Sequence, residues 1–315
     1  CIDDYCRQHD PFIRHIVRIT RAYLEDTIDE STGEPFLKPV RVKLFGEGDR
    51  ESVVLPLYCR EAYQHAEEFC KLLGKRIRSA GLYKTLLLRR IGSTMFAGQK
   101  TIEKLLSKND LDTEDAIDVL SEEEDELEED EIVSDTRNLA ANEIELLRQC
   151  RQLLEDNQEK DPKYQEVKRY LLDEGWLQLG CIIFSQYYDS VRWLATQLSS
   201  EDLPEEKIGI YSGSSRSGII HKCLFKPMAR EEIKQMVRRG ELRLIIGTDA
   251  ASEGLNLQRR GTLINLDLPW NPTRLEQRKG RIQRIGQIRH EIWILNLRYQ
   301  DSVEDRVHEL LSSRL

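Results

Sequence analysis

From about residue 180 onward, short apolar runs alternate with amphipathic helical patterns, and this alternation limits the possible folds more than any other feature. Five runs have the length and residue types of buried strands: CIIFS (181–185), IGIYS (208–212), LRLIIGT (242–248), TLINLD (262–267) and IWILNL (292–297). Helical patterns such as YYDSVRWLATQLSS separate several of them. The alternation predicts an α/β fold, in which a parallel sheet carries helices on both faces.

Polar residues or glycine directly follow the predicted strands. In open parallel sheets, ligands bind at the carboxyl ends of the strands. The residues expected there are Ser185, Gln186, Ser212, Gly213, Thr248, Asp249 and Asp267. A sheet that served stability alone would not need such residues at these ends, so we expect a binding site along this edge.

The first 175 residues have a different sequence pattern from the rest of the chain. Helical patterns dominate, and two alternating runs, PVRVKLF and SVVLPL, read as a pair of short strands. We therefore expect three parts in the chain: a mostly helical region at 1–110, an acidic linker at 111–135, and a lobe at 136–315 that ends in an amphipathic helix.

Charge is distributed unevenly along the chain. The net charge is −9, but residues 112–131 hold 13 acidic and no basic residues, so the remainder sums to −9 + 13 = +4. Residues 226–290 hold 14 Lys and Arg against 7 Asp and Glu, a local excess of +7. This excess fits an anionic partner, and a solvated surface of mixed charge explains it equally well.

Composition excludes several classes of protein. No run of about 18 apolar residues occurs, and no signal-peptide pattern opens the chain, so we expect a cytoplasmic protein with no membrane partner. The seven cysteines are scattered without a C-x-x-C pair, which favours reduced thiols over disulfides and predicts no metal site. Because the chain begins at Cys1, we expect it to be a piece of a longer polypeptide.

Two motifs carry the chemistry. GTDAASEGLNLQ (247–258) follows a predicted strand, and its hydroxyl and small residues allow close approach of a phosphate or ribose, although an ordinary turn reads the same way. EQRKGRIQRIGQ (276–287) places three arginines and a lysine on one short helix, with Arg278, Arg281 and Arg284 three apart. Arginine suits phosphate because its planar fork gives bidentate contacts and keeps its charge, while the alternative is a basic helix on the surface.

The order and spacing of these motifs resemble a known family. TDAASEGLN, DLPWNP (267–272) and EQRKGRIQRIGQ are similar to motifs V and VI of superfamily 2 helicases and, within them, of the bacterial type of Swi2/Snf2 ATPase. CIIFSQY is similar to motif IV. The resemblance covers about 180–300 and implies a RecA-like C-terminal helicase lobe, preceded by a helical protrusion and inter-lobe region.

The resemblance also implies roles for individual residues. Arg281 and Arg284 would contact the phosphates of ATP, with Arg284 as the arginine finger. The other ATP-binding positions would be Gln277, Gly280, Gly254 and Asn256, although related helicases often carry Asp where this chain has Asn256. The DNA-binding positions would be Ser185, Gln186, Ser212, Gly213, Thr248, Asp249 and Ser252, with Thr248 on the DNA backbone.

A complete motor also needs a phosphate-binding loop of the form G-x-x-x-x-G-K-[ST] and a pair of Walker B acids. The closest run, GSTMFAGQKT (92–101), has the wrong spacing and reads as helix, and Asp267 is followed by Leu268. ATP and Mg²⁺ would therefore be bound mainly by an N-terminal RecA-like lobe of the same polypeptide, and this chain alone is expected to be inactive. The expected partners are that lobe, duplex DNA and further protein subunits. Two alternatives stay open: a non-catalytic interaction module and a strand-separating helicase.

Overall fold

The computed structural model describes most of the chain. The described residues are 21–28, 33, 35–37, 40–48, 51–77, 80–107, 139–213, 216–249, 255, 257–284, 286–302 and 304–305. The expected acidic linker, and most of the expected C-terminal amphipathic helix, lie outside these residues.

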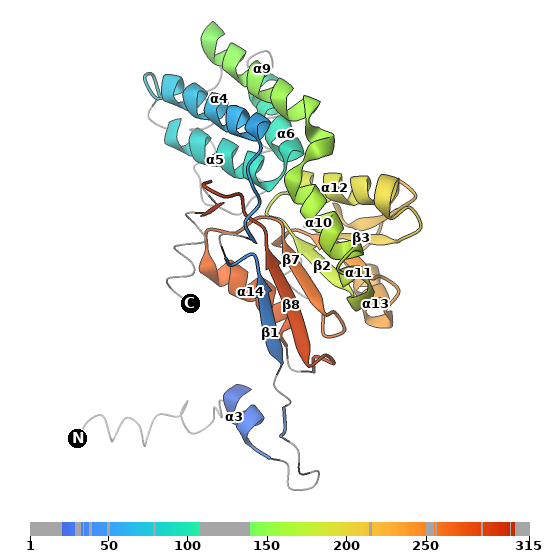
Figure 1. The fold of residues 1–315 in the computed structure, drawn as a ribbon. Helices are drawn as coiled ribbons and strands as arrows, with labels where there is room; N and C mark the ends of the chain where they lie inside the picture. The colour runs from blue at the N-terminus through green and yellow to red at the C-terminus, as the bar shows by residue number, and fades with distance from the viewer. Residues whose placement is uncertain are drawn as a thin grey trace, which may run out of the picture.

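One eight-stranded sheet organises the lobe, with strand order β1-β8-β7-β2-β6-β3-β4-β5 (Figure 1). The strands are β1 (Arg41–Phe45), β2 (Cys181–Phe184), β3 (Ile208–Tyr211), β4 (Gly218–His221), β5 (Leu224–Pro227), β6 (Leu244–Gly247), β7 (Thr262–Asn265) and β8 (Glu291–Asn296). The strands from β1 to β3 in this order pair in parallel, and β4 and β5 add an antiparallel hairpin. The five strands expected from the sequence are confirmed as β2, β3, β6, β7 and β8.

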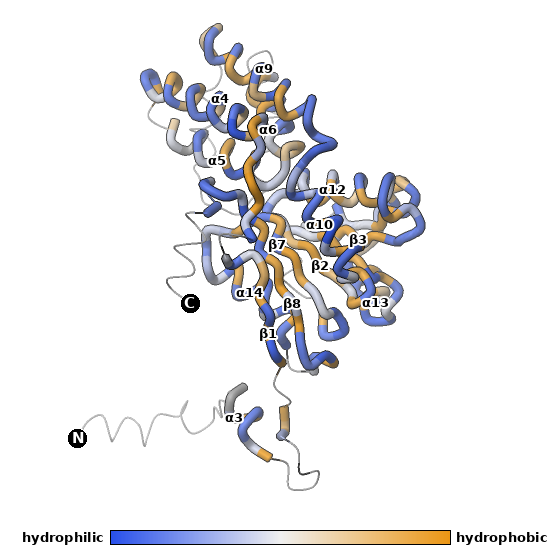
Figure 2. The backbone as a smooth tube through the Cα atoms, viewed as in Figure 1, coloured by the Kyte–Doolittle hydropathy of each residue, from blue (hydrophilic) through white to orange (hydrophobic). Residues whose placement is uncertain are grey.

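Helices cover both faces of the sheet, as expected. Cys181 and Ile183 of β2 face one core, built with α10 (Pro162–Leu172), α11 (Trp176–Leu179) and α12 (Tyr188–Gln197). Ile182 and Phe184 face the opposite core, built with α13 (Arg230–Arg239) and α14 (Pro272–Ile282). Successive side chains of a strand point to opposite faces, so a strand buried on both sides reads as a continuous apolar run. Figure 2 shows the hydrophobic colour concentrated on these strands.

A separate helical unit lies beside the carboxyl ends of the strands (Figure 1). It consists of α4 (Leu57–Leu73), α5 (Ala80–Ser93), α6 (Met95–Ser107) and α9 (Ala141–Asp156). These helices share their own core, to which α9 contributes Leu147, Cys150 and Leu154. The packing therefore moves the expected boundary at 136: α9 belongs to the helical unit, and the lobe begins near α10. The stretch 92–101 is helical as expected except at Thr94, since α5 ends at Ser93 and α6 begins at Met95.

Of the two short strands expected in the N-terminal region, the first is confirmed as β1 and the second is wrong. β1 pairs with β8, whereas Val53 of the second run forms only an isolated bridge with Tyr299. Phe45 of β1 packs against Trp176 and Trp293, with ring centroids 5.5 and 6.3 Å apart. Burial of this aromatic side chain in the lobe favours the long-range pairing over a local hairpin.

Two further short elements are α3 (Arg21–Asp26) and the 3-10 turn Gln158–Lys160, and a π turn at Leu198–Asp202 ends α12. No helix among the described residues is long and apolar enough to cross a membrane.

Candidate functional site

Helix α14 begins at a defined cap and presents two different faces. Asn271 accepts a hydrogen bond from the Thr273 amide, and Pro272 occupies the first turn, a combination that favours helix initiation. Arg278 and Ile282, four residues apart, are buried against the sheet, whereas Gln277 lies exposed on the outer side. The helix therefore separates arginines that the sequence shows as one run.

Arg278 is fully buried and paired. Its Nε lies 2.5 Å from Asp249 Oδ1, and its Nη1 donates to Asn265 Oδ1 at 3.1 Å and to the Asp267 carbonyl at 2.9 Å. The guanidinium also sits 5.5 Å from the ring centroid of Phe184. Arg278 therefore anchors α14 to the loops after β6 and β7, and the expectation that the whole arginine run awaits an outside anion is wrong at this position.

Arg281 and Arg284 have the opposite environment. Arg281 is partly exposed on α14, and Arg284 lies exposed just beyond the end of the helix. Neither makes an ion pair with any residue that the structure describes. Gly280 is exposed beside them, and a Cβ placed on it would meet nothing within 4 Å. Two permanently charged groups thus stand beside open space, in the last turn of α14 and just beyond it.

Gly286 and Gln287 hold the turn that follows α14 in place. Gly286 has φ +87°, and a Cβ there would come 2.7 Å from Gln258 Nε2, so the position requires glycine. The Gln287 amide donates to the Ile282 carbonyl at 2.8 Å and to the Arg260 carbonyl at 3.1 Å. These bonds close the C-terminal turn of α14 and fix the backbone on both sides of Arg284.

Asp267 is the centre of a buried polar cluster at the carboxyl end of β7. Its Oδ2 accepts hydrogen bonds from Ser185 at 2.5 Å and from Ser93 at 2.6 Å, and its Oδ1 accepts one from the Gln186 amide at 2.9 Å. Arg278 Nη2 lies 3.8 Å from Oδ1. One carboxylate therefore joins the end of β2, the arginine helix α14 and the helical unit.

The expected DNA-binding residues lie along one edge but differ in access. The ends of β2, β6 and β3 are neighbours in the sheet, and the Thr248 amide donates to the Tyr211 carbonyl at 3.1 Å. Gln186, Gly213 and Thr248 are partly exposed, whereas the Ser185 and Ser212 side chains are buried. Ser185 donates to Asp267 and Asp249 pairs with Arg278, so both groups are occupied within the protein. Three expected residues lie outside the described ones: Ser252, Gly254 and Asn256.

Two residues at this edge were not singled out as site residues from the sequence. The Trp270 side chain is 45% exposed, and the Arg89 guanidinium from α5 lies 5.2 Å from its ring centroid. Arg89 also donates to Gln186 Oε1. No local sequence pattern points to Arg89, because its partners Gln186 and Trp270 lie about a hundred residues or more away.

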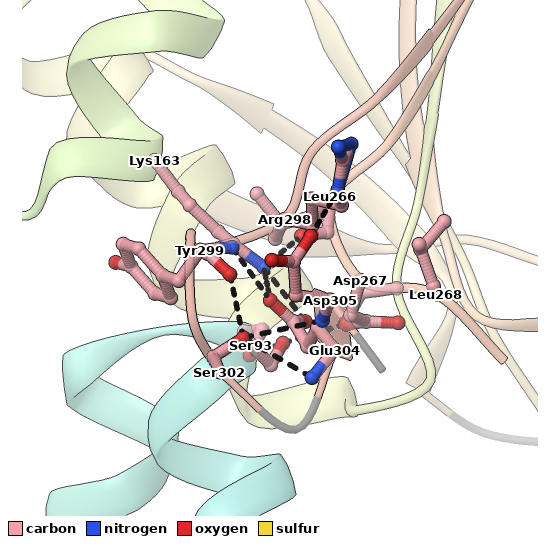
Figure 3. A network of polar contacts seen from close by, with 12 residues as sticks. Ser93, Lys163, Leu266, Asp267, Leu268, Arg298, Tyr299, Ser302, Glu304 and Asp305 are labelled. Carbon is pink, nitrogen blue, oxygen red and sulfur yellow. Dashed lines mark hydrogen bonds and ion pairs between the residues drawn. The ribbon is translucent and has the colours of Figure 1, made fainter. Parts of the chain in front are cut away.

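A second buried cluster ties the segment after β8 to the same corner (Figure 3). Lys163 Nζ, fully buried, donates to the Leu266 carbonyl at 2.7 Å and to both Glu304 oxygens at 2.8 Å. Burial raises the pKa of Glu304 to about 7, and the Lys163 ammonium acts in the opposite direction. Because Leu266 directly precedes Asp267, the two clusters form one continuous polar junction. Within the described part of the chain, no group of three or more His, Cys, Asp or Glu side chains could hold a metal ion.

Replacing Arg278 with methionine is expected to lower the free energy of unfolding by about 3 kcal/mol, because it removes the buried cation beside Asp267 and leaves Asp249 with only the more distant Arg274, 3.9 Å away. Urea denaturation measures the loss. Lys279→Met is the control, since Lys279 is more exposed and, among the residues that the structure describes, pairs only with Glu276, at 3.4 Å. Equal losses in the two variants would show that Arg278 is not an anchor.

Comparison with known proteins agrees with this geometry. Residues 163–286 match the family model described as "Helicase conserved C-terminal domain". The "Uncharacterized ATP-dependent helicase YqhH" of Bacillus subtilis is 38% identical over 134 residues, which cover 42% of this chain and 21% of that protein. The "RNA polymerase-associated protein RapA" of Vibrio campbellii is 48% identical over 95 residues, 30% of this chain and 9% of that protein.

Among solved structures, the Pyrococcus furiosus Hef helicase domain shares the fold. Its TM-score is 0.51 at 18% identity, over 89% of this chain and 59% of that chain. This chain spans only about a fifth of the length of YqhH. The matched segment runs from α10 through Gly286 and so contains strands β2 to β7, together with Asp267, Arg278, Arg281 and Arg284. This part of the chain is therefore similar to the conserved C-terminal domain of helicases.

Proposed function

We propose that this lobe belongs to an Snf2-type, DNA-dependent ATPase that translocates on duplex DNA. The observation that carries the proposal is the contrast within one helix. Arg278 is buried and neutralised, while Arg281 and Arg284 stand accessible without an acidic partner among the described residues. Leaving two guanidinium groups unpaired beside an anchored helix suits a ligand with several negative charges.

ATP is the ligand that fits best. Arg281 and Arg284 would reach its phosphates, with Arg284 stabilising the charge that develops during phosphoryl transfer. Gln277 and Gly280 lie beside them on the exposed side of α14, and Gly254 and Asn256 complete the proposed ATP-binding set. The ion and most of the triphosphate would be held by an N-terminal lobe, since among the described residues no cluster of three or more His, Cys, Asp or Glu side chains could hold a metal ion. This chain alone would then not hydrolyse ATP.

Duplex DNA would lie along the carboxyl edge of the sheet. Gln186, Gly213 and Thr248 are accessible there, together with Trp270 and the Arg89 guanidinium that lies over it. Ser252 stays in the proposed set, whereas Ser185 and Ser212 leave it because their side chains are buried. Asp249 is assigned to positioning Arg278, since a carboxylate repels phosphate.

The proposal predicts binding that follows salt concentration and not base sequence. Contacts from Thr248 and arginine side chains to the backbone would make the logarithm of affinity fall linearly with the logarithm of salt concentration. Fluorescence anisotropy with two unrelated duplexes of equal length measures both effects. A strong preference for one duplex, with a shallow salt slope, would contradict the proposal.

A strand-separating helicase is the second candidate, because relatives of this chain are named helicases. Displacement of a triplex-forming strand from duplex DNA reports translocation alone, whereas release of one strand of a duplex reports unwinding. ATP-driven triplex displacement without strand release supports the translocase. Efficient strand release would favour the helicase. A lobe that only docks a protein partner would show neither.

A further inference from the structure

We infer that Ser93, at the break between α5 and α6, is a positioning residue that couples the helical unit to the arginine helix through Asp267. The inference rests on the proposed ATPase function of Arg281 and Arg284. It adds a regulatory path into that site from a part of the chain that has a core of its own.

The Ser93 hydroxyl contacts Asp267 and two serines of the lobe. It is fully buried, and its Oγ lies 2.6 Å from Asp267 Oδ2, 2.8 Å from Ser190 Oγ and 3.2 Å from Ser185 Oγ. A carboxylate only accepts, so the single Ser93 proton goes to Asp267. Hydrogen bonds to a charged acceptor are the stronger kind, particularly when both groups are buried.

From Asp267 the path to the arginines is short. The Asp267 carbonyl oxygen accepts a hydrogen bond from Arg278 Nη1 at 2.9 Å, and Asp267 Oδ1 lies 3.8 Å from Arg278 Nη2. Arg278 is one helical turn before Arg281 on α14. A displacement of Ser93 therefore changes the hydrogen bonding of Asp267. Asp267 in turn binds the guanidinium of Arg278, the arginine that anchors α14.

The helical unit meets the lobe tightly at this point. A Cβ placed on Gly92 would lie 2.9 Å from the hydroxyl of Tyr63 in α4 and 3.4 Å from Cδ of Glu304 in the lobe, so both neighbours pack closely against α5 at this position. Immediately after Ser93, the Thr94 hydroxyl lies 2.9 Å from Ser190 Oγ, and the Met95 amide donates to Asp161 Oδ2 at 2.9 Å. A displacement of the helical unit is therefore transmitted to the lobe through the contacts at the α5–α6 break. Misplacement of a catalytic group by about 1 Å can cost roughly a hundredfold in rate.

Ser93→Ala tests the inference, with Thr101→Val as the matched control. Both are made in the longer protein, meaning a polypeptide that contains this chain together with the proposed N-terminal lobe. Thr101 is also a buried hydroxyl of the helical unit, but it donates within α6 to the Ala97 carbonyl at 2.9 Å and forms no hydrogen bond with a described residue of the lobe. We expect Ser93→Ala to reduce DNA-stimulated kcat about five- to tenfold with KM for ATP within twofold, and Thr101→Val to change neither by more than twofold. In a double-mutant cycle with Asp267→Asn, the Ser93→Ala effect should largely disappear, because both changes remove one interaction.

Amide hydrogen exchange in α14 separates this inference from the proposed function. Ser93→Ala should speed exchange in 272–282, and Thr101→Val should not, whether or not the protein hydrolyses ATP. Absence of ATP turnover in the wild type would remove the proposed function while this readout still decides the coupling. Unchanged α14 exchange in Ser93→Ala, or an equal kcat loss in Thr101→Val, would overturn the inference.

Discussion

Arg284→Ala is expected to reduce ATP turnover by the longer protein about a thousandfold or more without weakening its fold. Arginine fingers contribute about 10³–10⁵ in rate, because they stabilise charge that appears only in the transition state. Arg284 is exposed and forms no ion pair with a described residue, so its removal should change the free energy of unfolding by less than about 0.5 kcal/mol. Steady-state hydrolysis with saturating duplex DNA gives the rate, and urea denaturation gives the stability.

The control for this prediction is a second exposed arginine away from the site. Arg239 at the C-terminal end of α13 is 67% exposed and lies 3.7 Å from Glu241. Arg239→Ala should retain nearly full turnover. If Arg284→Ala also retained turnover, Arg284 would not be an arginine finger.

Lys163→Met is expected to lower the free energy of unfolding by about 3–5 kcal/mol near neutral pH, because it leaves the buried Glu304 carboxylate without a cation. Burial already raises the pKa of Glu304 to about 7, and loss of Lys163 removes an interaction that lowers it. A carboxyl whose pKa is raised on folding binds its proton more tightly in the folded state. Stability is then lost as pH rises from the ordinary range of a glutamate through the folded-state pKa. The variant should therefore be less destabilised at pH 5 than at pH 8.

The double variant Lys163→Met/Glu304→Leu distinguishes a charge effect from a packing effect. Removing both charges should recover most of the loss, since apolar residues often replace buried ion pairs at little cost. Lys84→Met serves as the surface control, because Lys84 and Glu67 are about half exposed, and it should change stability little. The same pH-independent loss in Lys163→Met and in the double variant would contradict the prediction.

Sequence patterns predict the central strands of the sheet well and the strands at its two edges poorly. β2, β6 and β7 are apolar runs with polar ends, so local pattern sufficed. The hairpin of β4 and β5 turns through Lys222 and Cys223, both with positive φ, where asparagine or glycine would have given the usual signal. The place of β1 depends on Phe45 meeting aromatic residues more than a hundred positions away, which no local pattern contains.

The candidate site shows the same division between local and long-range information. The motif resemblance singled out Gln277, Arg281 and Arg284, which lie exposed or partly exposed on α14 or just beyond it. Spacing could not separate Arg278, since it has the same residue type and the same three-residue interval. Its burial is decided by Asp249 and Asp267, which come from two other loops. In the same way, Ser93 of the helical unit helps to bury Ser185 at a strand end that was expected to be accessible.

ATP turnover by the longer protein, with and without duplex DNA, tests most directly whether this lobe works in a DNA-driven motor. We predict strong stimulation by duplex DNA, lost in both Arg281→Ala and Arg284→Ala and kept in Arg239→Ala. Absence of turnover under either condition would contradict this function and leave the exposed arginines to serve the binding of another anionic partner.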